Sequence, residues 1–246
     1  KFDDFLIGVS KLPLSDLSLT TNGQLLLKKA AVLEESGIKR INISLDTLNP
    51  LKFKQIARGG DLETVLAGIA KMQALGIKIK INMVPMRNQN LSDILRLLDF
   101  SLERDIELRF IELMRMGHLL HDSSYQQEFL SMQEILDEIA TVYSFQRADA
   151  PFDSTAVRFH IPDKGYFGII ANESEPFCTA CTRLRISSDG YLYGCLSSSR
   201  RQSLAELLEL PSHLVLPRLQ RLLVSALGDK QLSFQGETTV MKFIGG

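Results

Sequence analysis

The sequence has 246 residues, of which 45% are hydrophobic and 23% charged, and its formal net charge at pH 7 is -1. This composition is typical of a globular protein with one large or two modest cores, and it gives no overall reason to expect nucleic acid or an anionic membrane as partner. No apolar run reaches the length of a membrane span and the first residues do not resemble a signal peptide, so we expect a cytoplasmic protein.

Apolar residues at the start of the chain have helical spacing. Phe2, Phe5, Leu6 and Val9 follow this spacing, and no methionine or capping residue precedes them. We therefore expect that the chain starts inside a helix and that an N-terminal part of the protein is missing.

Strands and helices then alternate as far as residue 112. The expected strands are 16–21, 40–45, 77–84 and 106–112, and the expected helices are 24–36, a short one opened by Asn49-Pro50, 61–76 and 90–104. This alternation with short loops indicates parallel strands joined by right-handed crossovers, as in an α/β sheet or barrel.

Each expected strand has one apolar and one polar face. The polar face carries Ser18, Thr20, Asn42, Ser44, Asp46, Lys78, Lys80, Asn82, Glu107 and Arg109. A packed barrel interior is filled by branched apolar side chains, so this face suggests an open lumen that holds a polar ligand. The alternatives are a hydrogen-bond network that satisfies itself, or an edge strand.

The pattern changes after residue 115, and we expect a partial barrel at 1–115 and a second region at 116–246. A helix is expected at 131–141, and short antiparallel strands are expected at 143–147, 156–161 and 166–170. Further on we expect a hairpin of 183–187 with 191–195, and helix over 203–227 with a break at Pro211.

Three cysteines, Cys178, Cys181 and Cys195, are the only ones in the sequence. Their odd number argues against a disulfide framework, and two thiolates in a C-x2-C run with a third from a hairpin suit a soft metal. A structural zinc ion needs four protein ligands, whereas a three-cysteine 4Fe-4S cluster leaves one iron open. Zinc, a cluster and unligated cysteines all stay open on spacing alone.

Basic and polar residues near these motifs are candidates for ligand binding. Arg183 and Arg185 lie two apart on an expected strand beside the cysteines, where their guanidinium groups could clamp a phosphate. The alternative is an exposed pair on a hairpin. Thr20, Ser44 and Met114 lie at or just beyond strand ends, the rim at which barrel enzymes bind ligands.

Five segments together resemble the molybdenum cofactor biosynthesis protein A family: TTNG at 20–23, RINISLD at 40–46, LRFIELM at 108–114, FCTACTRLRISSDGYLYGCL at 177–196, and the terminal IGG. The resemblance implies a radical S-adenosylmethionine (SAM) enzyme, a GTP 3',8-cyclase of molybdenum cofactor biosynthesis. It also implies a partial (β/α) barrel of the radical SAM type that lacks its N-terminal strands, followed by a C-terminal α+β region with an iron-sulfur site.

The resemblance also assigns residues to roles. Cys178, Cys181 and Cys195 match ligands of a C-terminal 4Fe-4S cluster, and Arg183 and Arg185 match catalytic positions. GTP contacts match Thr20, Lys80, Arg183, Leu184 and Arg185, and SAM contacts match Ser44, Met114 and, less directly, Arg109. Gly245-Gly246 match a tail that reaches the active site, for which a frayed end is the alternative.

One family motif is missing, because no cysteine precedes residue 178 to form the N-terminal C-x3-C-x2-C cluster site. We therefore expect SAM and a second 4Fe-4S cluster only in the full-length parent, and an inactive chain by itself. The resemblance further allows a homodimer, and a downstream cyclic pyranopterin synthase that uses the product. A different radical SAM enzyme with an auxiliary cluster and a non-enzymatic zinc module stay open.

Overall fold

The structure is a computed structural model that describes residues 1–152 and 154–234. The chain divides into two compact units. Unit 1 comprises Lys1–Ile111, Gln133–Asp149 and Ala156–Ile170, and unit 2 comprises the described residues of 112–132, 150–155 and 171–234. The expected boundary at 115/116 stays a prediction, although 133–149 and 156–170 group with the first unit.

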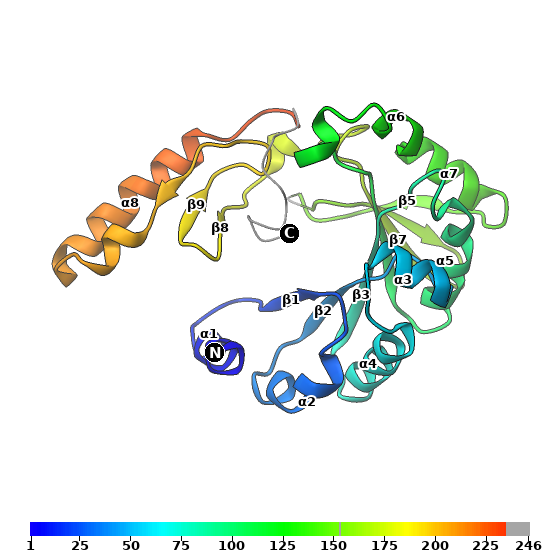
Figure 1. The fold of residues 1–246 in the computed structure, drawn as a ribbon, viewed down its shortest axis with the longest axis horizontal. Coiled ribbons are helices and arrows are strands. Elements are labelled where there is room, and N and C mark those ends of the chain that lie inside the picture. The colour runs from blue at the N-terminus through cyan, green and yellow to red at the C-terminus, as the bar shows by residue number, and fades with distance from the viewer. Residues whose placement is uncertain (153, 235–246) are drawn as a thin grey trace. The chain divides into compact units, whose positions relative to one another are not determined.

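Unit 1 is built on one seven-stranded sheet in the order β1-β2-β3-β4-β7-β6-β5 (Figure 1). The strands are β1 (Ser18–Thr21), β2 (Arg40–Ser44), β3 (Lys78–Met83), β4 (Glu107–Ile111), β5 (Gln146–Ala148), β6 (Val157–Ile161) and β7 (Gly165–Ile170). Strands β1 to β4 and β7 are parallel neighbours, while β6 and β5 continue the sheet in antiparallel pairing. The expected α/β alternation is confirmed.

Helices cover the apolar face of this sheet. They are α1 (Phe2–Ser10), α2 (Leu26–Glu35), α3 (Pro50–Ile56), α4 (Leu62–Ala74), the short 3-10 helix η1 (Leu91–Asp93), α5 (Ile94–Leu102) and α7 (Met132–Ala140). Ile43, Ile81 and Leu108 on the strands and Val65 and Leu97 on the helices are all completely buried. Burial of these side chains on one face supplies the main driving force for this layer.

Two helix starts follow the capping chemistry that the sequence predicts. The Asn49 side chain accepts hydrogen bonds from the backbone N–H groups of Leu51 and Lys52 at 2.9 and 3.1 Å, and Asp61 accepts from that of Thr64 at 2.8 Å. Each cap satisfies backbone donors that the first helical turn leaves without partners.

Two sequence predictions differ from the structure in detail, and a third is confirmed. The buried side chain of Asn90 does not cap the helix expected from residue 90, because it bonds the backbone of Asp46, Val84 and Met86 instead. The stretch starts as the 3-10 helix η1, and α5 begins at Ile94. The strand expected at 143–147 is shifted to Gln146–Ala148, since the Tyr143 hydroxyl bonds Asp99. The helical stretch expected at 203–227 is present as the 3-10 helix η4 (Ala205–Leu208) and α8 (Ser212–Gly228), with the break at Pro211 as expected.

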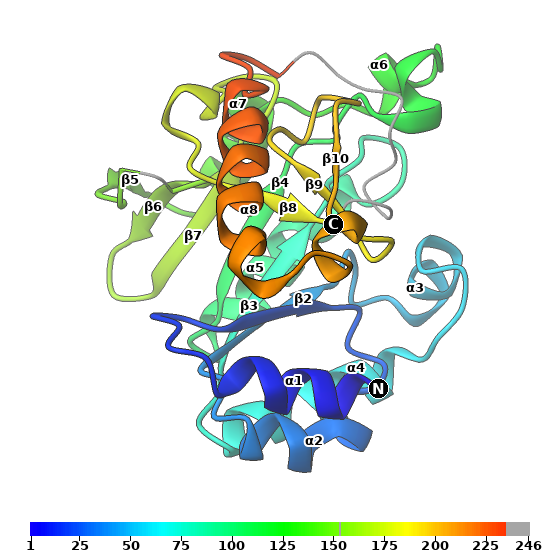
Figure 2. The same ribbon diagram turned by 90° about the vertical axis from the view of Figure 1, so that its left-hand side faces the viewer.

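Unit 2 contains a small antiparallel sheet in the order β10-β9-β8 and a long helix, α8. Its elements are η2 (Gly117–Leu120), α6 (Tyr125–Glu128), η3 (Cys178–Ala180), β8 (Arg185–Ile186), β9 (Tyr191–Tyr193), β10 (Gln202–Ser203), η4 (Ala205–Leu208) and α8 (Ser212–Gly228). Helix α8 runs along the small sheet (Figure 2), and Leu192 of β9 packs with Leu222 and Ala226 of the helix. The expected hairpin is confirmed, with β10 as a third strand.

No helix within the described ranges is both long and apolar enough to cross a membrane. The terminal glycine pair, Gly245-Gly246, lies outside the described residues.

A buried carboxylate ties together three segments of unit 2. Glu112 is fully buried, and its oxygens accept hydrogen bonds from the backbone N–H groups of Met132 (2.7 Å), Glu173 (2.8 Å) and Ser174 (3.0 Å) and from the Ser174 hydroxyl. A buried charge is tolerated only when it is bonded in this way.

We expect Glu112→Gln to lower the free energy of unfolding by about 1.5 to 3 kcal/mol, because an amide NH2 replaces an acceptor that faces backbone donors. Urea unfolding followed by circular dichroism measures the change. The control is Glu103→Gln, whose exposed carboxylate pairs only with the neighbouring Arg104, and it should change stability by less than about 1 kcal/mol. Equal effects of the two substitutions would contradict the role of Glu112.

Candidate functional site

The three cysteines of unit 2 line one cavity. Cys178 begins the short helix η3, Cys181 follows its last residue, and Cys195 comes two residues after β9. Apolar side chains form much of the wall, and Arg185 and Lys230 are its two basic residues; the lining also includes Pro176, Phe177, Leu196, Phe234, Asn172, Ser197 and Gln231. Residues from four stretches of the chain thus gather around three thiols.

A glycine lets helix α8 approach the segment between β9 and Cys195. A Cβ atom on Gly194 would lie 1.6 Å from the carbonyl oxygen of Ala226, where no real side chain fits. Gly194 is therefore required for close packing rather than for an unusual backbone angle. This contact fixes the end of α8, and with it Lys230, beside the thiols.

Basic groups lie close to Cys181. The Lys230 ammonium lies 3.7 Å from its Sγ and the Arg183 guanidinium 4.0 Å. Burial alone would raise the pKa of Cys181, but the Arg183 backbone N–H, Lys230 and the Arg183 side chain lower it overall. Burial and the two other thiols raise the pKa of Cys178.

A half-buried leucine, Leu184, separates the two arginines, and strand β8 begins only at Arg185, so Arg183 precedes the strand expected at 183–187. The Arg183 guanidinium lies 5.4 Å from the centre of the Phe177 ring, and Arg185 lines the thiol cavity. The Leu184 side chain packs instead against the Leu192, Leu222 and Ala226 cluster. Both guanidinium groups thus lie on the cysteine side, and Leu184 offers only its backbone there.

Among the described residues, three thiols and no carboxylate or imidazole line this cavity, a donor set that suits a soft metal or an iron-sulfur cluster. No group of three or more His, Cys, Asp or Glu side chains among the described residues is close enough together to hold a single metal ion. The cavity therefore fits a soft metal or a cluster by the chemistry of its sulfur donors.

The polar face of the unit 1 sheet carries a hydrogen-bonded row across four strands. Arg109 of β4 donates to the Asn82 side chain of β3 at 2.9 Å and to the Asn42 side chain of β2 at 2.7 Å. Asn42 in turn donates to the Thr20 hydroxyl of β1 at 3.4 Å. Burial lowers the pKa of Arg109, and the nearby Glu107 opposes this shift.

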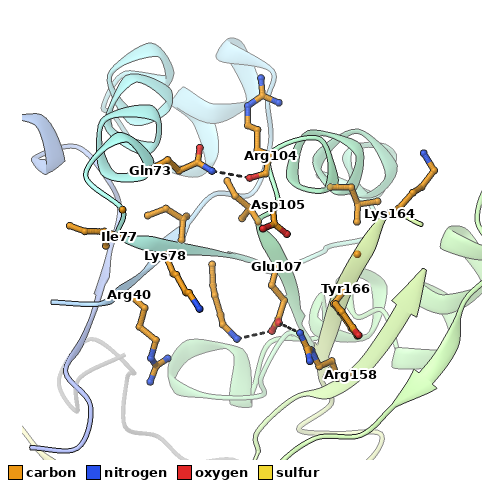
Figure 3. Close-up of a pocket in the computed structure, with 16 residues that line it drawn as sticks. Arg40, Gln73, Ile77, Lys78, Arg104, Asp105, Glu107, Arg158, Lys164 and Tyr166 are labelled. Carbon is orange, nitrogen blue, oxygen red and sulfur yellow. Dashed lines mark hydrogen bonds and ion pairs between the residues drawn. The ribbon is translucent and has the colours of Figure 1, made fainter. Parts of the chain in front are cut away.

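A cavity of about 500 Å³ opens at the ends where β2, β3 and β4 begin (Figure 3). In it Glu107 lies between two cations, with Lys80 at 2.8 Å and Arg158 at 3.0 Å. Arg158 also stacks on the Tyr166 ring at 3.8 Å, and its buried Nε has no hydrogen-bond partner among the described residues. The charged residues lining the cavity are mostly basic: Arg40, Lys78, Lys80, Arg104, Arg158 and Lys164 against Asp105 and Glu107.

At the opposite strand ends, Ser44 and Asp46 line a cavity of about 350 Å³ together with α3 residues and the Arg58-Gly59-Gly60 loop. Burial raises the pKa of Asp46, and its hydrogen bond from the Val84 backbone N–H opposes that rise. Met114, in unit 2, is half-buried and packs on Met116 and Tyr193.

Comparison with known protein families gives two matches. Residues 106–235 match the model described as Molybdenum Cofactor Synthesis C, and residues 1–101 match the Radical SAM superfamily. The first covers more than half of the chain. The chain belongs to the molybdenum cofactor biosynthesis protein A family.

Curated relatives agree with this family assignment. The chain is 39% identical over 194 residues to a GTP 3',8-cyclase of Listeria monocytogenes, a match that covers 77% of this chain and 58% of the relative. It is 36% identical over 195 residues to a GTP 3',8-cyclase of Synechocystis sp., covering 79% and 59%. The match thus spans less than two thirds of either relative.

A solved structure shares the fold. The crystal structure of Streptococcus suis SuiB bound to S-adenosylmethionine matches with a TM-score of 0.52 and 17% identity, covering 83% of this chain and 49% of that one. The α/β fold of the radical SAM type is therefore shown, while the partial barrel stays a prediction.

The structure places the predicted site residues of this family member in several groups. The three cysteines, Arg183 and Arg185 lie together in unit 2. In unit 1, Thr20 and Arg109 belong to the row of hydrogen bonds, so the alternative of a self-satisfied network holds for part of the polar face. Lys80 and Ser44 line different cavities of unit 1.

Sequence reasoning missed Lys230 altogether and gave Asp46 no role. Lys230 follows α8 without any motif, and only its packing brings it to the thiols. Asp46 lies on the expected polar face just after the RINIS strand, and this position at a strand end was the signal that could have marked it as a site residue.

We expect Gly194→Ala to destabilise unit 2 by about 1 to 3 kcal/mol, because the new methyl group must push α8 away from β9. Thermal unfolding and the rate of maleimide labelling of Cys195 measure the effect, and both should change. Gly228→Ala is the control, since its Cβ would meet no atom within 4 Å. Unaltered stability and labelling in Gly194→Ala would show that the close approach is unnecessary.

Proposed function

We propose that this chain is part of a GTP 3',8-cyclase, which converts GTP to 3',8-cyclo-7,8-dihydro-GTP in the first step of molybdenum cofactor biosynthesis. Its family membership and the names of its curated relatives support this reaction. The observation that carries the proposal is the cavity of unit 2, where three thiols and the Arg185 guanidinium are brought to one place.

The metal that we propose there is a 4Fe-4S cluster held by Cys178, Cys181 and Cys195. With three protein ligands, such a cluster supplies one open iron, to which the purine of the nucleotide can bind. The three thiols and the two nearby cations, Lys230 and Arg183, support an anionic cluster rather than neutral, unligated thiols.

Arg183 and Arg185 are the proposed catalytic residues, and they would bind the phosphates of GTP. Both guanidinium groups face the thiol side, and their forked geometry suits phosphate oxygens. Leu184 would contact the nucleotide through its backbone only, since its side chain is packed in the α8 cluster.

In unit 1, we propose Thr20 and Lys80 as further GTP contacts. Lys80 lines a cavity with several more cations than anions, which suits a polyanionic ligand. Glu107 holds the Lys80 ammonium in place at 2.8 Å.

For SAM, the proposed contacts are Ser44, Met114 and Arg109. Ser44 is exposed and lines a cavity with Asp46 at the strand ends where radical SAM barrels are expected to bind ligands. The two asparagine partners of Arg109 hold its guanidinium in a fixed orientation. SAM cleavage belongs to the parent enzyme with its second 4Fe-4S cluster, because this sequence has no further cysteines.

Further proposals concern the cellular setting. We propose that the protein acts in the cytoplasm and forms a homodimer. A cyclic pyranopterin synthase is the enzyme that we propose uses its product.

After anaerobic reconstitution, we expect about four iron and four sulfide ions per chain and no stoichiometric zinc, because three thiolates fit one cluster. Iron, sulfide and zinc analysis with EPR of the reduced sample provides the measurement. Replacing all three cysteines by alanine should abolish iron uptake. One zinc ion per chain without sulfide would instead support the zinc module.

We expect Arg183→Ala and Arg185→Ala each to weaken GTP binding by about 1.5 to 3 kcal/mol, the usual worth of a hydrogen bond to a charged group. Calorimetric titration of the reconstituted chain with GTP measures this loss. Arg221→Ala removes the same charge from the exposed face of α8 and is the matched control. Wild-type affinity in both variants would rule out the phosphate clamp, and binding of another nucleotide or metabolite in place of GTP would support a different radical SAM enzyme.

A further inference from the structure

Lys230 lies just beyond α8 and reaches into the thiol cavity of unit 2. Its ammonium group donates hydrogen bonds to the Arg183 carbonyl oxygen at 2.6 Å and to the Gly194 carbonyl oxygen at 3.2 Å, and it lies 3.7 Å from the Cys181 Sγ. A lysine ammonium has three N–H donors, and here each has a partner.

The three partners belong to the two cysteine-bearing segments. Arg183 follows Cys181 by two residues, and Gly194 immediately precedes Cys195. One side chain therefore holds the C-x2-C segment and the end of the hairpin at a fixed distance from each other.

Neighbouring contacts keep Lys230 in this position. Gln231 accepts a hydrogen bond from the Ser197 hydroxyl at 2.9 Å, and Asp229 pairs with Arg200 at 3.3 Å. Together with the close approach of Ala226 to Gly194, these contacts anchor the chain on both sides of the lysine. The ammonium is thus held by the fold and not merely by its own flexible stem.

The charge of Lys230 has no carboxylate partner within the described part of the chain. Its neighbours are two carbonyl dipoles and one sulfur atom. A half-buried cation in such surroundings is best compensated by negative charge on the thiol side, which a thiolate-bound cluster would provide.

We propose that Lys230 is a positioning residue for the three-cysteine cluster, which it serves by joining the two cysteine segments and by donating an N–H to the ligating sulfur of Cys181. This inference rests on the proposed cluster. Reduction adds negative charge to a cluster, and a nearby cation and N–H···S hydrogen bonds stabilise that reduced form. Lys230 should therefore raise the reduction potential as well as the occupancy of the site.

The test compares Lys230→Met, which keeps a long apolar stem without charge or donors, with Lys230→Arg, which keeps both. Lys28→Met, on an exposed position of α2, is the matched control. Each chain is reconstituted anaerobically, and iron and sulfide are counted per chain. The midpoint potential of the cluster is then read from EPR-monitored redox titration, a value that a purely structural role would not shift.

We expect Lys230→Met to lose at least half of its iron, and its remaining clusters to have a more negative midpoint potential than the wild type. Lys230→Arg should keep most of the iron and shift the potential less. If Lys230→Met binds no iron, the midpoint potential is measured instead on Lys230→Gln, which keeps an uncharged N–H donor.

Two negative results have different meanings. Wild-type iron content and wild-type potential in Lys230→Met and Lys230→Gln would overturn the role of Lys230 and leave the cluster proposal intact. A wild-type chain that takes up no iron and sulfide would overturn the proposed function itself.

Discussion

The alternation of apolar and polar side chains along the parallel strands is the constraint on which unit 1 depends. Successive residues of a strand point to opposite faces, so Ile41 and Ile43 pack under the helices while Asn42 between them must face the other side. That polar face needs hydrogen-bond partners, and Arg109 supplies them by joining Asn42 and Asn82. A dry core and a polar surface suited to ligands thus come from one and the same pattern.

In unit 2 the comparable constraint is steric. The thiol cavity has short elements around it, with β8 only two and β9 three residues long, so these strands alone cannot fix three cysteines. Helix α8 supplies the rigidity, and it can lie this close only because residue 194 has no side chain. The chemistry of the cavity therefore depends on a residue that takes no part in it.

Local patterns predicted much of the fold. Strand alternation, the caps at Asn49 and Asp61, and the turn between β8 and β9 could be predicted because each depends on neighbours in the sequence. Asn90 was misjudged, since its side chain has the chemistry of a helix cap but bonds a loop and a strand end that precede it. Similarly, no neighbouring residues in the sequence indicate that β7 pairs in parallel with β4. This pairing makes the antiparallel strands part of the main sheet.

The same limit applies to the candidate site. The cysteines and arginines lie within one short stretch of sequence, so their association could be predicted from spacing. Lys230 comes from a distant stretch and becomes a neighbour only when α8 packs on β9. Leu184 is assigned to a GTP contact by the family resemblance alone, and the structure adds that its side chain packs in the hydrophobic cluster.

The pairing of β4 with β7 also bears on how unit 1 folds. Leu108 pairs with Phe167, and the intervening chain is longer than that between any other paired strands of this sheet. Closing a longer loop costs more chain entropy, so this ladder is expected to form after the β1 to β4 ladders and the β6-β7 hairpin. Its closure brings the Phe110 and Phe167 rings into edge-to-face contact at 6.3 Å. The β4-β7 ladder is therefore expected to be the last part of the sheet to form, and this ring contact forms with it.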